Sequence, residues 1–216
     1  TLQEQLLALE LPFDQYHDRF KRIVSVASAV HDLGKANDHF QGMIYGIRDV
    51  RESPQGLRHE WVTLLMLEEL REWFLPALNQ LSMDFAIVEW VVVGHHPALD
   101  HASPPRMSPP GAGAEIEMLM DHKDYGMALT CIQSLLRLTG PPKCRTMRQS
   151  LLAGEKSVFG KLASWSRHAH VKWMKMRSSA DRRLVAAVKS CLIAADVAGS
   201  ALPKAMPGDP GRWHWI

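Results

Sequence analysis

Apolar residues recur along most of the chain at the spacing of amphipathic α-helices. Over residues 15–32 they return every three or four positions, from Tyr16 to Val30, so that one face of a helix is apolar. Asp14 is expected to cap the first turn of this helix, and Gly34 is expected to end it in the left-handed conformation that glycine adopts without steric cost. The same spacing predicts further helices over residues 59–74, 83–93, 115–122, 127–138, 156–176 and 181–200.

Proline and glycine mark the connections between these helices. Pro76 ends the helix over residues 59–74, and residues 98–113 are rich enough in proline, serine and glycine to predict a loop. No run of alternating apolar and polar residues is long enough to predict a β-strand. We therefore predict an all-α fold, and a length of 216 residues with 46% hydrophobic side chains favours a single domain over residues 1–216.

Composition excludes several classes of protein. No apolar run approaches the roughly 18 residues that a membrane-spanning helix needs, and the chain does not open with the pattern of a signal peptide. The three cysteines are widely separated and odd in number, which argues against a disulfide framework and against a cysteine-based zinc site. We expect a cytoplasmic protein with no membrane partner. Because the first residue is Thr1 and not methionine, we also expect a piece of a longer polypeptide.

The formal net charge of +2 hides an uneven distribution of charge. Residues 1–140 hold 11 Lys and Arg against 19 Asp and Glu, whereas residues 141–190 hold 12 against 2. A strongly basic segment in an otherwise acidic molecule is typical of a contact with nucleic acid, and the alternative is a solvated helix face rich in cations.

Cationic and aromatic side chains alternate within this basic region. The combination suits tracking of a nucleic-acid backbone together with stacking on its bases. The alternative for Trp165 and Trp173, which are eight residues apart, is that both pack inward on one face of a helix. The candidate contacts are Arg167, Lys172, Lys175, Arg177 and Trp165.

Histidine and aspartate side chains gather at the ends of three predicted helices. They are the adjacent His31 and Asp32, then His59, and then the pair His95 and His96. Asp196 lies in the apolar stretch 192–199, where a carboxylate is costly to bury without a cation. Imidazole nitrogen and carboxylate oxygen are ligands of Zn, Mn, Fe, Co and Ni, so convergent helix ends would form a metal site here.

The number of these side chains is enough for two metal ions. Two ions about 3.5–4 Å apart can share a bridging carboxylate and activate a water for attack on a phosphoryl group. A lone histidine is more often a surface or hydrogen-bonded core residue, so the ordered set favours a metal centre more strongly than any member does. The expected ligands are His31, Asp32 and Asp196 for one ion and His59, His95 and His96 for the other, with Asp32 as the bridge.

Four stretches of the chain resemble the HD nuclease domain of the CRISPR-associated type I helicase-nuclease. They are residues 31–36 with 40–41, 58–60, 94–96 and 195–200, which read His-Asp-Leu-Gly-Lys-Ala with Phe-Gln, Arg-His-Glu, Gly-His-His and Ala-Asp-Val-Ala-Gly-Ser. The resemblance implies an HD-domain helical bundle, with its metal-site core in residues 14–96 and 179–200. It further implies cleavage of single-stranded DNA by a two-metal centre, a helicase domain or subunit, and recruitment by an RNA-guided surveillance complex.

The chain departs from this family at one position. Family members usually carry a further metal-binding histidine on a helix before the His-Asp pair, and His17 is the only histidine before His31. The 14 residues between them would span about 21 Å along one helix, too far for a shared metal. We therefore expect His17 at the surface, and either the missing ligand precedes Thr1 or one metal site is incomplete.

The leading hypothesis is a metal-dependent nuclease that cleaves single-stranded DNA in type I CRISPR interference. Asp32 and Lys35 are the catalytic candidates. Lys35 is one because its ammonium, near the metals, would stabilise negative charge on the scissile phosphate. The alternative for Lys35 is a cation that interacts only with a helix C-terminus. The alternative functions are an HD phosphohydrolase acting on nucleotides or cyclic nucleotides, and an inactive HD module for docking.

Overall fold

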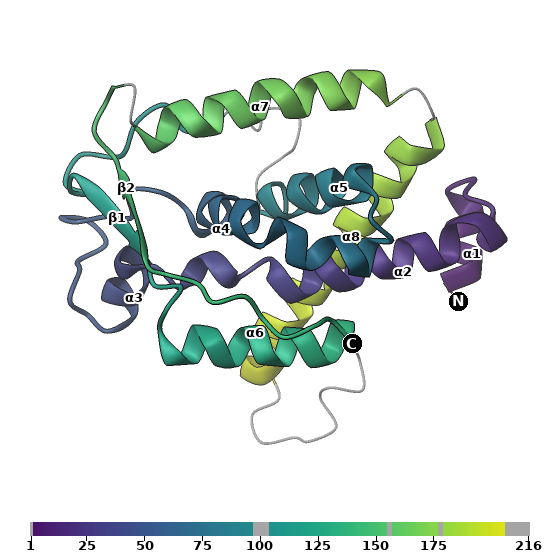
Figure 1. The fold of residues 1–216 in the computed structure, drawn as a ribbon, viewed down its shortest axis with the longest axis horizontal. Helices are drawn as coiled ribbons and strands as arrows, with labels where there is room; N and C mark the ends of the chain where they lie inside the picture. Colours follow the sequence, from purple (N-terminus) through teal and green to yellow (C-terminus); the bar gives the residue numbers. More distant parts are fainter. Residues whose placement is uncertain (1, 97–103, 155–156, 177–178, 206–216) are drawn as a thin grey trace.

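The computed structural model describes residues 2–96, 104–154, 157–176 and 179–205 of the chain. These residues are mainly helical, with one small two-stranded sheet, and this confirms the predicted all-α class (Figure 1). The helices are α1 (Leu2–Ala8), α2 (Phe13–Val30), α3 (Asp38–Ile44), α4 (His59–Phe74), α5 (Ser82–Val93), α6 (Lys123–Leu136), α7 (Val158–Lys175) and α8 (Ser179–Ala205), with the 3₁₀ turns η1 (Leu33–Lys35) and η2 (Leu75–Leu78).

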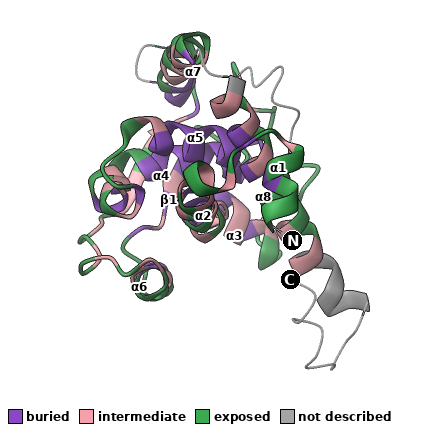
Figure 2. Cartoon of the chain, turned by 90° about the vertical axis from the view of Figure 1, so that its right-hand side faces the viewer, coloured by how far each residue is buried: buried purple, intermediate pink, exposed green. Residues whose placement is uncertain are grey.

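Helices α4 and α5 form the centre of the core. α5 is apolar on almost every side and is buried from Asp84 to Val93, as expected of a helix that other helices surround. α2 packs against α5, and α8 packs against both α2 and α5. Figure 2 shows the buried residues gathered in α4 and α5, while α6 and α7 are exposed along their outer sides. The ends of α2, α4 and α5 consequently meet within the packed part of the molecule.

One expected helix and one expected helix cap are wrong. The segment 115–122 is not a helix, because residues 115–118 form strand β1 (Glu115–Met118), antiparallel to β2 (Met147–Ser150). Ile116 and Met118 are buried, so the four residues alternate as a half-buried strand does. Asp14 does not cap α2, because the helix begins at Phe13, after Pro12, and Asp14 lies within its first turn.

The role expected of Gly34 is also wrong. Gly34 lies inside η1 and does not have the left-handed conformation. A Cβ atom at this position would lie 2.1 Å from the carbonyl oxygen of His59 and 2.4 Å from the backbone nitrogen of Thr63. Glycine is therefore required because η1 packs directly on the backbone of α4.

Of the predicted loop over residues 98–113, the structure describes residues 104–113, which contain no helix or strand. Residues 98–103 lie outside the described residues.

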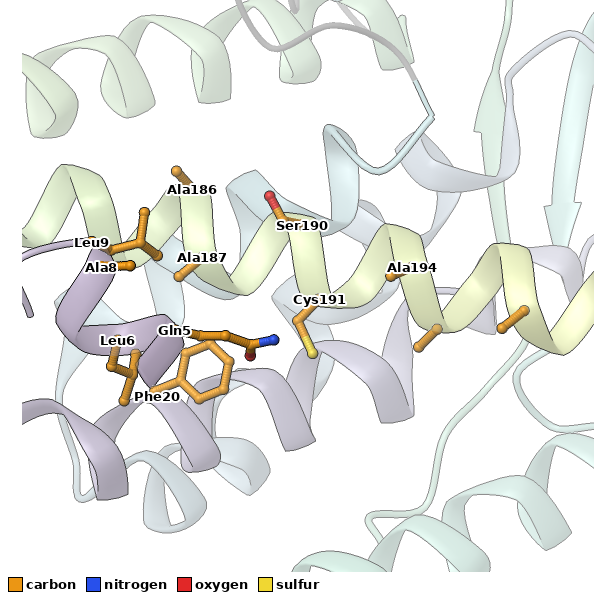
Figure 3. Close-up of a pocket in the computed structure, with 12 residues that line it drawn as sticks. Gln5, Leu6, Ala8, Leu9, Phe20, Ala186, Ala187, Ser190, Cys191 and Ala194 are labelled. Atoms are coloured by element: carbon orange, nitrogen blue, oxygen red, sulfur yellow. The ribbon is translucent and has the colours of Figure 1, made fainter. Parts of the chain in front are cut away.

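A pocket of about 610 Å³ lies between α1, α2 and α8. Figure 3 shows Phe20 and Cys191 at this pocket, and none of the expected metal ligands lines it. Within the described part of the chain, no helix has the length and apolar character needed to cross a membrane.

The packing of η1 on α4 predicts the effect of adding one methyl group. Gly34→Ala should lower the free energy of unfolding by about 1–3 kcal/mol or more, because the new Cβ meets backbone atoms that cannot give way. Gly126→Ala is the matched control, since Gly126 lies within α6 and its Cβ would meet nothing within 4 Å. The control should be neutral or stabilising by about 0.5–1 kcal/mol. Urea unfolding measures both, and equal stabilities would contradict the prediction.

Candidate metal centre

The structure brings the six expected ligands together from four helices. They converge on one region from the end of α2 (His31 and Asp32), the start of α4 (His59), the end of α5 (His95 and His96) and the interior of α8 (Asp196). Among the described residues, two groups have ligand atoms within 4.8 Å of one another, and these groups are His31, Asp32 and Asp196 on one side and His59, His95 and His96 on the other. The division is the one expected from the sequence, and metal binding by these residues stays a prediction.

Asp32 lies between the two groups. Its Oδ2 atom is 3.5 Å from Nε2 of His31, and its Oδ1 atom is 3.4 Å from Nε2 of His59. The His31 Nε2 atom is also 3.7 Å from Oδ1 of Asp196. One carboxylate oxygen therefore faces each group, which is the arrangement that a bridging ligand requires.

Backbone carbonyls fix the tautomers of two histidines. Nδ1 of His31 donates to the carbonyl of Ser28 at 2.9 Å, and Nδ1 of His95 donates to the carbonyl of Val92 at 2.5 Å. A carbonyl oxygen can only accept, so the proton of each ring is on Nδ1 and the lone pair is on Nε2. Both Nε2 atoms are thus prepared to bind a metal.

Buried atoms without hydrogen bonds support the fit of this site to a metal. Oδ1 of Asp32 and the Nε2 atoms of His59 and His95 are buried and have no hydrogen-bond partner among the residues that the structure describes. Such atoms are costly to bury unless something else satisfies them. All three belong to the two groups, and nitrogen with carboxylate oxygen is the donor set of divalent transition metals. The residues present therefore fit the metal ions that the sequence implied.

The surroundings set the protonation states that metal binding needs. Burial opposes ionisation of Asp32, but the Lys35 ammonium and the neighbouring rings of His59 and His31 outweigh it and hold the pKa of the carboxyl well below its usual range. Nζ of Lys35 lies 2.6 Å from Oδ2 of Asp32. Burial lowers the pKa of His95 to about 4, and burial also lowers the pKa of His96. At neutral pH the carboxylate is therefore charged and these two imidazoles are neutral, as ligands must be.

Three further residues clarify the boundaries of the site. His17 is partly exposed, contacts Asp18 at 2.9 Å and belongs to neither group.

Sequence reasoning assigned no role to Glu60 or Thr63, which are completely buried on the first two turns of α4. The signal that could have found them is a polar residue on a helix whose other buried residues are almost all apolar.

The candidate nucleic-acid contacts lie on α7, apart from Arg177, which is outside the described residues. Arg167 and Lys175 are exposed, and Lys172 is half-buried. The Trp165 ring packs edge-on against Trp61, with 5.9 Å between the ring centroids. Its placement agrees with the inward-packing alternative, and the role of the cations in binding nucleic acid stays a prediction.

Burial of His95 predicts how stability depends on pH in metal-free protein. The pKa of His95 is about 4 when folded and about 6.5 when unfolded, so only the unfolded state gains the proton between these values. The free energy of unfolding should fall by up to about 1.4 kcal/mol per pH unit as the pH drops from 6.5 to 4. Urea unfolding in a chelator should show a shallower pH dependence for His95→Gln. The exposed control His122→Gln should keep the wild-type slope, and three equal slopes would contradict the prediction.

Comparison with known proteins agrees with this geometry. The family described as "Cas3, HD domain" matches residues 2–202. A protein of Myxococcus xanthus (strain DK1622), which is named as a CRISPR-associated nuclease/helicase Cas3, is 34% identical over 200 residues. The match covers 90% of this chain and 25% of that protein, so the chain spans about a quarter of the length of its relative. No solved structure matches the chain. The chain therefore belongs to the Cas3 HD-domain family.

Proposed function

We propose that this domain is a metal-dependent nuclease that cleaves phosphodiester bonds of single-stranded DNA in type I CRISPR interference. The observation that carries the proposal is the position of Asp32, with one oxygen toward each of two groups of histidine and carboxylate ligands. Family membership supports the nuclease class. The requirement for metal is our inference from the paired groups, and the specificity for single strands is what the resemblance of the motifs implies.

The six ligands have distinct parts in this proposal. Two divalent ions of Mn, Ni, Co, Fe or Zn, when bound, would lower the pKa of a water and stabilise charge on the phosphoryl oxygens. His31 and Asp196 would hold one ion, and Asp32 would lie between the two. The second ion would be held by His59, His95 and His96.

Lys35 has a position from which it can act on the phosphate. Its side chain is 37% exposed, so the ammonium is accessible from solvent although it contacts Asp32. The ammonium also lies 5.8 Å from the centre of the Phe40 ring, and that ring contacts the ring of His59 edge-on. A cation at this edge of the site would stabilise negative charge that develops on the scissile group. Before substrate binds, the same cation keeps the Asp32 carboxylate ionised.

The strand path and the partners complete the proposal. Arg167, Lys172 and Lys175 would neutralise phosphates of the bound strand along α7. The Myxococcus xanthus relative is named for nuclease and helicase functions together, and this favours a helicase domain or subunit as the partner that supplies the strand. We further propose that an RNA-guided surveillance complex recruits the pair in the cytoplasm, and that residues 1–216 act as one HD domain.

The central experiment removes the bridging carboxylate. Asp32→Ala should reduce cleavage of a single-stranded oligonucleotide by more than about 100-fold in the presence of Mn²⁺, Ni²⁺ or Co²⁺, because both groups lose a shared ligand. Asp18→Ala is the matched control, since Asp18 is on α2 and its side chain is 81% exposed. A chelator should stop the wild-type enzyme, and metal analysis should find two ions per chain.

Three outcomes would contradict this proposal. Asp32→Ala could retain its fold by circular dichroism and still cleave at the wild-type rate. Wild-type protein could cleave mononucleotides or cyclic nucleotides in preference to oligonucleotides, and this would favour the phosphohydrolase class. It could also bind no metal and cleave nothing, which would leave a docking module.

The basic face of α7 predicts a change in salt dependence. Replacement of Arg167, Lys172 and Lys175 by Gln should weaken binding of single-stranded DNA and lower the slope of log K against log salt by about 2, because three phosphate contacts are lost. The control replaces Lys21, Arg51 and Lys123, which are exposed on other segments. Fluorescence anisotropy at several salt concentrations measures both, and an unchanged slope would place the DNA path elsewhere.

A further inference from the structure

Glu60 is a completely buried carboxylate beside the metal centre. It lies on the first turn of α4, directly after His59, and is 0% exposed. Neither carboxylate oxygen has a well-aligned hydrogen bond within the described part of the chain. A cation lies close to it, since the Nε atom of Arg58 is 2.5 Å from Oε1. Because an isolated buried carboxylate is costly, its position here requires a compensating interaction.

The other oxygen of Glu60 faces the ring of His59. The distance from Oε2 of Glu60 to Nδ1 of His59 is 3.4 Å. His31 and His95 each have a backbone carbonyl as the acceptor for Nδ1, whereas the group that faces Nδ1 of His59 is this carboxylate. The three histidines therefore share one arrangement, in which an acceptor faces Nδ1 and Nε2 points into the centre.

We propose that Glu60 is the positioning residue of His59, and this inference rests on the proposed metal centre. Oε2 of Glu60 is the acceptor that faces Nδ1, and it favours the tautomer with the lone pair on Nε2, the buried atom that lies 3.4 Å from Oδ1 of Asp32. A neutral imidazole has two tautomers, and only this one offers Nε2 as a ligand. The carboxylate also makes the imidazole a stronger ligand than a neutral acceptor would.

Arg58 explains how the negative charge is tolerated. The Arg58 side chain is 60% exposed and its guanidinium pairs with Oε1 of Glu60, so the charge of the buried carboxylate is offset by a cation on a side chain that reaches water. Oε2 then remains free for the ring of His59. A purely structural role, such as an acidic residue favoured at a helix N-terminus, would affect stability alone. The two roles are therefore distinguishable by measurements on the His59 ring.

The test compares Glu60→Ala and Glu60→Gln with the wild-type chain. In metal-free wild-type protein, the ring ¹⁵N shifts of His59 should show a protonated Nδ1 and an unprotonated Nε2. Glu60→Ala should give a mixture of tautomers and bind Mn²⁺ about 10–100-fold more weakly by calorimetry. Glu60→Gln keeps an oxygen acceptor, so it should retain the tautomer and lose less than about 10-fold. Glu89→Gln is the control, because Glu89 is also a buried carboxylate but pairs with Arg71 at 3.9 Å.

Several results would overturn the inference. One is an unprotonated Nδ1 in the wild-type ring, and this measurement holds even if Glu60→Ala does not fold. Another is an unchanged tautomer or unchanged Mn²⁺ affinity in a folded Glu60→Ala, which would leave Glu60 with a structural role. Neither readout involves DNA, so protein that binds Mn²⁺ but cleaves no strand would refute the nuclease proposal while the assignment of Glu60 stands.

Discussion

The hydroxyl group of Thr63 is the interaction on which the rest of the centre depends. It accepts the backbone N–H of Gly34 at 2.8 Å and donates to the backbone carbonyl of His31 at 3.0 Å. α4 thereby holds the end of α2 and the following turn through one buried side chain. Because His59 lies one helical turn before Thr63, the same contact sets the separation of His59 from Asp32. The ligand geometry is consequently a property of helix packing.

Burial favours the neutral form of both kinds of ligand. This helps a histidine to bind metal and opposes metal binding by a carboxylate. The core around the end of α5 disfavours a charged imidazole, so His95 is neutral at physiological pH. The same environment would disfavour an ionised carboxylate at Asp32, but His59 and Lys35 more than compensate for it. The packing that stabilises the fold therefore also gives the candidate ligands their metal-binding protonation states. Glu60 extends this principle, since Arg58 offsets its charge from the solvent side.

The sequence predicted helix α2, helices α4 to α8 and the residues that converge, because polar side chains at the ends of apolar helices produce a pattern that is visible in one dimension. It did not predict features that depend on contacts between distant segments. A left-handed turn and a close approach to α4 would each require glycine at position 34. Only the structure shows that the close approach is the reason. Strand β1 pairs with a segment about thirty residues away along the chain. Its alternation covers only four residues, so the helical spacing of the apolar residues around it predicted a helix instead. Glu60 could be read as an ordinary first-turn acid until its burial was known.

The position of α7 separates binding from chemistry in the proposed enzyme. Edge-on contacts of Trp165 with Trp61 and of Trp173 with Trp90 attach this helix to the core, so its cations lie toward solvent. Residues 1–140, which carry five of the six candidate ligands, have an excess of eight negative charges. An anionic strand is repelled by that part and attracted by the basic region, so affinity must come mainly from residues that do not touch the scissile group. The centre itself then needs to supply only orientation and charge stabilisation at one phosphate.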